Sequence, residues 1–167
     1  MVTTLHTRLK HSVSVPPLIT HTHPSPVSVS VGMGDKMGIV LAESVKDLPF
    51  IETINLSDNN LTDKSLCKII NSIITIATLT DLDLSENIID GQAALALAKF
   101  LGSSYCKLQR LIMKSANIDD DECPMFVVAL KKNQSLKELD MSCNLLAVSE
   151  NLNSVKPALI TGSEALA

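Results

Sequence analysis

The chain has 167 residues, a formal net charge of -4 from 14 Lys and Arg against 18 Asp and Glu, and a hydrophobic content of 46%. Length and apolar content suffice for one domain with a sizeable core, but the negative charge has the wrong sign for neutralising phosphates. Aromatic residues make up 2% and Trp is absent, so base stacking lacks its rings and nucleic acid is not an expected partner.

The sequence also argues against membrane insertion and secretion. Its most apolar stretch, residues 67–82, is interrupted by polar side chains and falls short of the roughly 18 apolar residues of a spanning helix. Residues 1–15 contain no apolar block of the kind that signal peptides carry. The four cysteines lie far apart without metal-type pairing, which fits a reducing compartment. We therefore expect a cytoplasmic protein without membrane contact.

The N-terminal part divides into two segments. Residues 1–26 are rich in Ser, Thr, His and Pro, which predicts an extended or loosely ordered segment. Alternating valines could form a strand at residues 12–15 or 27–31, and the second is favoured because a helical pattern follows it. From Asp35 onward, apolar residues recur at helical spacing, so residues 27–50 form a degenerate leading repeat.

Residues 51–146 contain four copies of one motif, with starts at 51, 79, 108 and 136, so the copies are 28 or 29 residues apart. The motif reads Leu-x-x-Leu-x-Leu-x-x-Asn, with Ile or Met in some apolar positions and Ala116 in place of the third Asn. Fifteen residues after each of the first three starts, an apolar helical face follows. These predicted faces are residues 66/69/70/73, 94/97/98/101 and 123/126/127/130.

The same count after the fourth start gives Asn151, Ser154, Val155 and Ala158, which are half polar. Residues 147–167 are therefore interpreted as a degenerate last helix and tail. Repeat proteins need polar caps at both ends, so an uncapped C-terminal end predicts self-association or a missing continuation of the array.

These residues resemble the leucine-rich repeat family, specifically its ribonuclease-inhibitor-like subclass with long repeats. The resemblance covers about residues 27–146. It implies a right-handed α/β solenoid, or horseshoe, with parallel strands on the concave face and helices on the convex face. In the family the motif Asn, here Asn59, Asn87 and Asn144, hydrogen-bonds the backbone of the turns. Because Ala116 cannot do so, we expect a looser third turn unless Asn117 substitutes.

Motifs for catalysis, cofactors or metals are missing from the sequence. It has no Gly-rich phosphate loop, nucleophile elbow or zinc-protease motif, so neither a catalytic site nor a cofactor is expected. His21 and His23 lie in a Pro-rich segment without nearby thiols or carboxylates, and are interpreted as solvated rather than metal-bound. The acidic run 119–122 lacks the spaced oxygens of a calcium loop, and is interpreted as capping the third helix.

The informative polar residues alternate with the core positions along each predicted strand, so they must face the concave side. These candidate partner-binding residues are Thr53, Asn55, Ser57, Asp81, Asp83, Ser85, Arg110, Ile112, Lys114, Glu138, Asp140 and Ser142. Across neighbouring strands, ~4.8 Å apart, they should align in rows. The predicted function is a non-enzymatic module that binds a protein partner through this sheet.

Two interpretations of the central strand stay open. Arg110 could bridge Asp81 and Glu138 in a charge ladder that relieves repulsion within an acidic sheet. Alternatively, Arg110, Ile112 and Lys114 form a recognition patch, since an exposed Ile and an Arg amid polar residues are typical of interface anchors. Both can hold, because a ladder would preorganise the Arg.

Two further functions stay open. By likeness to GTPase-activating proteins with such repeats, the chain could be a regulatory protein of that type, although only Arg8 and Arg110 are available to stabilise transition-state charge. It could also be a fragment of a larger leucine-rich-repeat sensor or scaffold.

Overall fold

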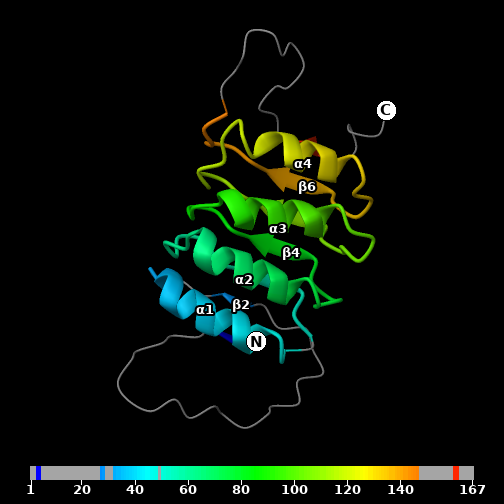
Figure 1. Cartoon of the computed structure of the whole chain (residues 1–167). Coiled ribbons are helices and arrows are strands. Elements are labelled where there is room, and N and C mark those ends of the chain that lie inside the picture. Colours follow the sequence, from blue (N-terminus) through cyan, green and yellow to red (C-terminus); the bar gives the residue numbers. More distant parts are fainter. Residues whose placement is uncertain (1–2, 5–26, 29–31, 49, 147–159, 162–167) are drawn as a thin grey trace, which may run out of the picture.

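The computed structural model describes residues 3–4, 27–28, 32–48, 50–146 and 160–161, and places strands and helices in strict alternation through its middle (Figure 1). The strand-helix units are β2 (Val27–Ser28) with α1 (Gly34–Val45), β3 (Thr53–Asn55) with α2 (Asp63–Ile73), β4 (Asp81–Asp83) with α3 (Gly91–Leu101), and β5 (Arg110–Ile112) with α4 (Cys123–Leu130). The strand β6 (Glu138–Asp140) follows, and two short strands, β1 (Thr3–Thr4) and β7 (Ile160–Thr161), lie at the ends.

The strands form one sheet in the order of the sequence. All neighbours from β1 to β6 are parallel, and β7 pairs with β6 in the antiparallel direction. The helices stack in sequence order along one side of this sheet (Figure 1). Because a helix is about 10 Å wide while strands are about 4.8 Å apart, the stack curves toward its strands. The predicted α/β solenoid, with strands on the concave face and helices on the convex face, is confirmed.

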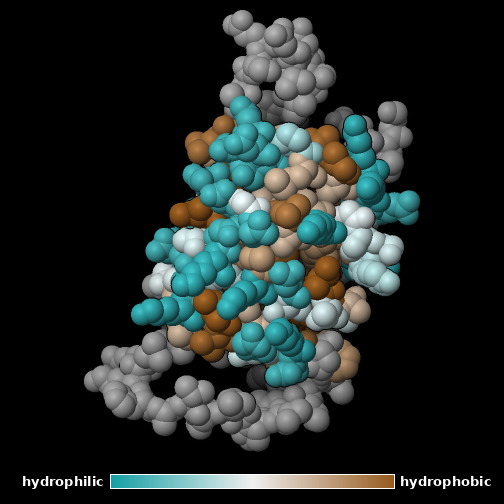
Figure 2. Space-filling view, viewed as in Figure 1, coloured by the Kyte–Doolittle hydropathy of each residue, from teal (hydrophilic) through white to brown (hydrophobic). Residues whose placement is uncertain are grey.

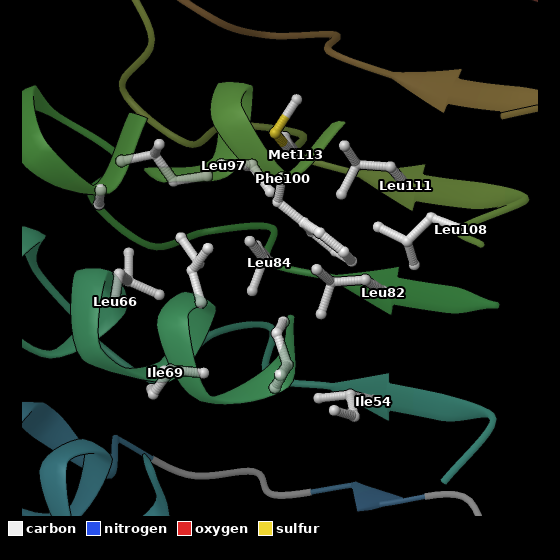
Figure 3. Close-up of a cluster of buried hydrophobic side chains, with 14 of the residues drawn as sticks. Ile54, Leu66, Ile69, Leu82, Leu84, Leu97, Phe100, Leu108, Leu111 and Met113 are labelled. Atoms are coloured by element: carbon white, nitrogen blue, oxygen red, sulfur yellow. The ribbon is translucent and has the colours of Figure 1, made fainter. Parts of the chain in front are cut away.

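The core lies between the two layers, where the motif positions meet the helices. Leu82 and Leu84 from the β4 segment and Leu111 from β5 point toward Leu66 of α2 and Phe100 of α3 (Figure 3). Every member of the predicted faces of α2 and α3 is buried. Each unit thus buries its apolar faces against its neighbours, as in other repeat proteins.

The helix α1 approaches the next turn unusually closely. A Cβ atom at Gly38 would lie 2.8 Å from Leu61 Cδ2 and 2.9 Å from the Cβ of Ser65. The helical pattern predicted from Asp35 onward therefore uses a glycine for close packing of α1 against the start of α2.

The predicted apolar face of α4 is only partly buried. Phe126 is buried, but Cys123 and Leu130 are half-buried and Val127 is 42% exposed, so including Val127 in the core face was wrong. Within the described residues, α4 packs against α3, and no further helix covers its other side. The alternative strand at 12–15 lies outside the described residues, as does all of the predicted degenerate last helix and tail at 147–167 except residues 160–161.

The sheet ends differently from the open end expected from the sequence. Ile160 and Thr161 of β7 pair with Leu139 and Glu138, so two of the three β6 residues have a neighbour on their outer side. The C-terminal edge of the sheet is thus covered at these positions, while among the described helices none covers the outer side of α4. Self-association through the C-terminal end stays a prediction.

The motif asparagines connect consecutive turns, as the resemblance implies. Asn87 Oδ1 accepts a hydrogen bond from the backbone N–H of Leu61 at 2.9 Å, and its amide donates to the carbonyls of Leu56, Leu84 and Ser85. Asn144 binds the third and fourth turns in the same way. One buried side chain thereby supplies partners to several backbone groups that water cannot reach.

The looser turn expected at Ala116 is not seen. The carbonyl of Ala116 accepts the N–H of Ile89 at 2.9 Å, and Asn144 Oδ1 accepts the N–H groups of Ala116 and Ile118. Ser115 has φ 52°, close to the 56° of Glu86 in the preceding turn. The backbone of the turn and the next asparagine compensate for the missing amide, and among the described residues the side chain of Asn117 has no part in this.

Aspartates cap the helix of the following repeat, which sequence spacing alone did not suggest. Asp35 accepts hydrogen bonds from Thr62 N at 2.9 Å and Ser65 Oγ at 2.6 Å, and Asp63 accepts one from Ala93 N at 2.6 Å. Gly91 occupies the position of the next repeat that is equivalent to Asp35 and Asp63, and it has no carboxylate. Accordingly α4 begins later in its repeat than α2 and α3 do.

The acidic run before α4 makes its side-chain hydrogen bonds within the turn ahead of the helix, and the predicted helix cap is not seen at Glu122. Asp119 Oδ1 accepts the N–H of Asp121 at 2.8 Å, while the carboxylate of Glu122 accepts the N–H of Asp119 at 3.3 Å. Glu122 itself precedes the first residue of α4 but makes no side-chain bond to the helix amides. Asp119 and Glu122 therefore close the turn ahead of the helix, and the side chain of Glu122 does not cap the helix itself.

Candidate partner-binding surface on the strand face

The sheet register aligns the twelve candidate residues in rows across the strand face. Pairing of β3, β4, β5 and β6 places Thr53, Asp81, Arg110 and Glu138 in a first row and Asn55, Asp83, Ile112 and Asp140 in a second. Backbone hydrogen bonds from Asp58 to Ser85, Glu86 to Lys114 and Ser115 to Ser142 extend the same alignment to the third row, Ser57, Ser85, Lys114 and Ser142.

The first row contains an ion pair between neighbouring strands. Arg110 Nε lies 2.7 Å from Asp81 Oδ1, and Thr80 Oγ1 donates to the other carboxylate oxygen at 2.7 Å. Partial burial tends to raise the pKa of Asp81, but the hydrogen bonds from Thr80 and Arg110 outweigh it, so the net pKa is lowered. The hydrogen bond with Asp81, together with nearby carboxylates, raises the pKa of Arg110.

The predicted charge ladder is therefore half formed. Glu138 attracts Arg110 electrostatically, but among the described residues Arg110 has its ion pair with Asp81 and none with Glu138. The guanidinium is thus fixed on one side, through Nε, and remains exposed on the sheet. A partly exposed pair of this kind adds ~0 to 1 kcal/mol to stability, so its main effect is to orient the Arg side chain.

Three residues of the second row close the ends of their own strands. Asn55 Oδ1 accepts hydrogen bonds from Ser57 N and Oγ, and Asp83 Oδ1 accepts the same pair from Ser85. Asp140 Oδ1 accepts the Ser142 N–H at 2.9 Å, and its hydrogen bonds from Ser142 lower the pKa of this carboxyl. This Asx-x-Ser turn, with Asn or Asp two residues before Ser, ties up one oxygen of each side chain.

The same turn leaves Ser85 little surface for a partner. Ser85 is 7% exposed and its hydroxyl donates to Asp83 at 2.7 Å. The other candidate residues are half-buried or exposed, so the strand face is polar and accessible at the remaining positions.

The strand β5 breaks the Asx-x-Ser pattern. Ile112 and Lys114 occupy the positions of the Asx and Ser residues, with Ile112 half-buried and Lys114 exposed. Arg110 and Ile112 line a shallow depression of ≈ 120 Å³ together with Asp81, Asp83 and the β3 residues Thr53 and Asn55. Lys114 and the β6 candidates lie outside it. The depression around Arg110 and Ile112 thus collects candidate residues from β3, β4 and β5.

A second and larger hollow was not found by sequence reasoning. It has a volume of about 630 Å³ and lies where the strands lead into the turns, with Ile88, Asn117 and Leu145 among its lining residues. The available signal was an apolar residue directly before the core position of a turn, as at Ile88 before Ile89.

Other site classes gain no support from the described part of the chain. Within it, no group of three or more His, Cys, Asp and Glu side chains could hold a metal ion. None of the helices described is long and apolar enough to span a membrane. The histidine pair His21 and His23 lies outside the described residues. The helix face is mainly hydrophilic, with apolar side chains in separate groups (Figure 2).

Comparison with known proteins points to the same architecture. A family model described as "Leucine Rich repeat" matches residues 47–69, 75–98 and 132–146. Mouse "NACHT, LRR and PYD domains-containing protein 5" is 32% identical over 96 residues, or 58% of this chain and 8% of that protein. Human "NACHT, LRR and PYD domains-containing protein 3" is 33% identical over 92 residues, which are 54% of this chain and 9% of that protein.

Mouse "Ribonuclease inhibitor" is 32% identical over 83 residues, which are 50% of this chain and 18% of the inhibitor. The chain therefore spans less than a fifth of the length of these relatives. The repeats, the parallel sheet with helices on one side and the hydrogen bonds of Asn87 and Asn144 agree with these matches. The chain contains leucine-rich repeats that are similar to those of the ribonuclease inhibitor.

Proposed function

We propose that this chain is a protein-binding module that holds a partner against its strand face, with β5 at the centre of the contact. Leucine-rich repeats serve as interaction domains, and nothing in the described residues suggests catalysis. The strand face presents a preformed surface, because its register and its turns are fixed by backbone and side-chain hydrogen bonds. A preformed surface loses little entropy on binding.

The main support for β5 as the binding centre is that Ile112 and Lys114 interrupt the pattern of Asx-x-Ser turns. At the other three strands the corresponding side chains serve the fold, because they close the strand ends. At β5 these positions are released from that role, and an Ile is left accessible between Asp83 and Asp140. An accessible Ile beside an oriented Arg110, surrounded by polar residues, fits an interface anchor.

The charge of the surface favours a partner with basic groups. Among the twelve positions, the carboxylates of Asp81, Asp83, Glu138 and Asp140 outnumber the cations of Arg110 and Lys114, and Arg110 is paired with Asp81. Association should therefore slow as salt concentration rises, because salt screens the attraction between the surfaces.

A photo-crosslinking experiment tests the proposed face. A photoreactive amino acid in place of Ile112 should crosslink a defined partner in cells, and the product should disappear when Arg110→Glu is added. The matched control places the same amino acid at Val40, an exposed apolar position on α1. Equal products from both positions, or none from position 112, would remove β5 as the binding centre.

A second candidate function is that of one section of a larger repeat array, such as a sensor. It is favoured by the matched relatives, of which this chain spans 8% to 18%. An antibody against residues 51–146 would show its size in cells, and a single band near 18.0 kDa would argue against a larger array.

The GTPase-activating alternative has less support. Arg110 is already paired with Asp81, and Arg8 lies outside the described residues. Turnover measurements with small GTPases would revive this alternative only if the chain accelerated hydrolysis and Arg110→Ala abolished the effect.

A further inference from the structure

Two exposed apolar side chains, Ile88 and Leu145, stand out at the turns that follow β4 and β6. They are 40% and 62% exposed, whereas the adjacent motif residue Ile89 is fully buried. The same position in the other two turns holds Asn60 and Asn117. The core of the turn therefore does not require an apolar side chain at this position. Exposed apolar side chains that gather at one place, as these two do at one hollow, are typical of contact surfaces.

Both side chains line the hollow of about 630 Å³ at the strand-exit edge. This hollow adjoins the strand face, because its lining residues Glu86, Ser115 and Cys143 directly follow Ser85, Lys114 and Ser142 of the third row. A partner that covers β4, β5 and β6 would thus reach the hollow by extending past the ends of these strands.

The hollow is bordered by a fixed backbone. Glu86, Ser115 and Cys143 all have left-handed backbone conformations, with φ between 52° and 58°. The turns on either side are held by hydrogen bonds from Asn87 and Asn144. The hollow therefore exists before any partner binds, and its breadth suits a segment of a protein better than an enclosed small molecule.

The chemistry of its lining defines the occupant. Ile88 and Leu145 offer apolar contact, and the amides of Asn60 and Asn117 can bind the backbone of an extended segment. Of the eight lining residues, Glu86 alone carries a charge. A neighbouring cation is attracted to this carboxylate, while a neighbouring anion is repelled.

We propose that this hollow is a second contact site, which takes an apolar side chain of the partner flanked in sequence by Lys or Arg. The proposal rests on the protein-binding function proposed above, but not on β5 being its centre. Segments of the partner that lie over the strand face and over the hollow would bind cooperatively, because both sites belong to one rigid scaffold.

Selection from a phage-displayed library of random peptides on the immobilised full chain tests this site. We expect enriched peptides with an apolar residue next to Lys or Arg. Their affinity should fall about tenfold or more on Ile88→Ser and on Leu145→Ser, as for other anchor contacts. It should be unchanged on Val40→Ser, the control at a 54% exposed apolar residue of α1. Glu86→Lys should remove the preference for Lys and Arg.

The exposed thiol of Cys143 provides a direct readout, because it lines the hollow while the other three cysteines are buried or half-buried. A bound peptide should slow alkylation of Cys143 and leave Cys67 unaffected. Melting temperatures of the Ser variants should match that of the unmodified chain, which excludes unfolding as the cause of lost binding.

Three outcomes would overturn the proposal: no enrichment, peptides with acidic flanks, or peptides that keep their affinity on both Ser variants. Peptides that respond only to Arg110→Glu or Ile112→Asp would support the strand face and reject the hollow. Peptides that respond only to Ile88→Ser and Leu145→Ser would support the hollow and reject β5 as the centre.

Discussion

The repeats that begin at residues 79 and 108 share one backbone architecture. They differ in how many of their side chains make hydrogen bonds that hold this architecture. In the first, Asp83 closes the strand end, Asn87 connects two turns, and α3 is capped by Asp63 of the preceding repeat. In the second, Ile112, Ala116 and a late, short α4 replace these features. At the turn, the carbonyl of Ala116 and the side chain of Asn144 make hydrogen bonds in place of the missing amide, so the second repeat keeps its backbone while its surface is free to change.

Truncating a core leucine of the regular repeat should have the largest effect on stability. Leu84 is fully buried between the layers (Figure 3), so Leu84→Ala should lower the free energy of unfolding by ~2 to 5 kcal/mol. Ile112→Ala, at a half-buried residue of the irregular repeat, should cost well under half as much. Urea denaturation of both variants measures the comparison, and equal losses would mean that Ile112 belongs to the core.

The loss of the motif asparagine should come next. Asn87→Ala would remove the partner of the Leu61 N–H and of the carbonyls of Leu56 and Leu84, and each unsatisfied buried group costs about 1–3 kcal/mol. Asn117→Ala, at an exposed residue of the turn without this Asn, should cost only about 1 kcal/mol, because its φ of 61° favours Asn over Ala. Thermal unfolding followed by circular dichroism distinguishes the two, and a stable Asn87→Ala protein would contradict the role of this side chain.

Removing a cap that one repeat gives to the next should have a smaller effect. Asp63→Ala removes the carboxylate that Ala93 N at the start of α3 binds at 2.6 Å and leaves this N–H with the Asp90 carbonyl at 3.0 Å, so it should cost about 1 kcal/mol. Hydrogen exchange of the first turn of α3 should accelerate with it, whereas the first turn of α4, which receives no cap from Gly91, should not respond. Uniform acceleration along the chain would instead indicate global destabilisation.

The turn before α4 should make stability depend on pH. Burial and the neighbouring Asp119 raise the pKa of Glu122 above its unfolded value of 4.5. The unfolded chain therefore releases this proton first as pH rises, and stability is lost between pH 4.5 and the folded-state pKa. Glu122→Gln should remove this loss, so its melting temperature should exceed that of the unmodified chain at pH 7.

At pH 4 the gap between Glu122→Gln and the unmodified chain should shrink, because Glu122 is then largely protonated. The effect of Asp119 has the opposite sign, since its pKa is lowered and its contribution is lost as pH falls below 3.8. A gap that does not change between pH 4 and pH 7 would show that Glu122 does not titrate in this range.

The regular features could be predicted from the sequence because they depend on local pattern. The apolar period of the motif predicted which side of each strand is buried, and the helical spacing predicted the faces of α2 and α3. Asn87 could be placed because its position in the motif fixes its surroundings. These inferences need knowledge of one repeat only, together with the rule that neighbours stack.

The remaining features depend on contacts between repeats. The Asp35 and Asp63 caps join residues 27 to 30 positions apart, and the Ala116 carbonyl takes over a role that the pattern assigned to a side chain. The Asx-x-Ser turns were present in the sequence, but spacing alone could not tell a strand-closing Ser85 from a partner contact. Val127 was misplaced because, among the described elements, α4 packs against α3 alone and this side chain is 42% exposed.

The central claim concerns the two Asx-x-Ser positions of each strand. At β5 these positions contact a partner, whereas at the neighbouring strands they form the hydrogen bonds that close the strand end. The most direct measurement of this claim is the affinity of the crosslinked partner for Ile112→Asp and for Thr53→Asp, matched substitutions in the same depression at β5 and β3. The account predicts a loss of about tenfold or more for Ile112→Asp, a much smaller loss for Thr53→Asp, and unchanged melting temperatures. Equal affinities of the two variants, or a loss explained by unfolding of Ile112→Asp, would contradict it.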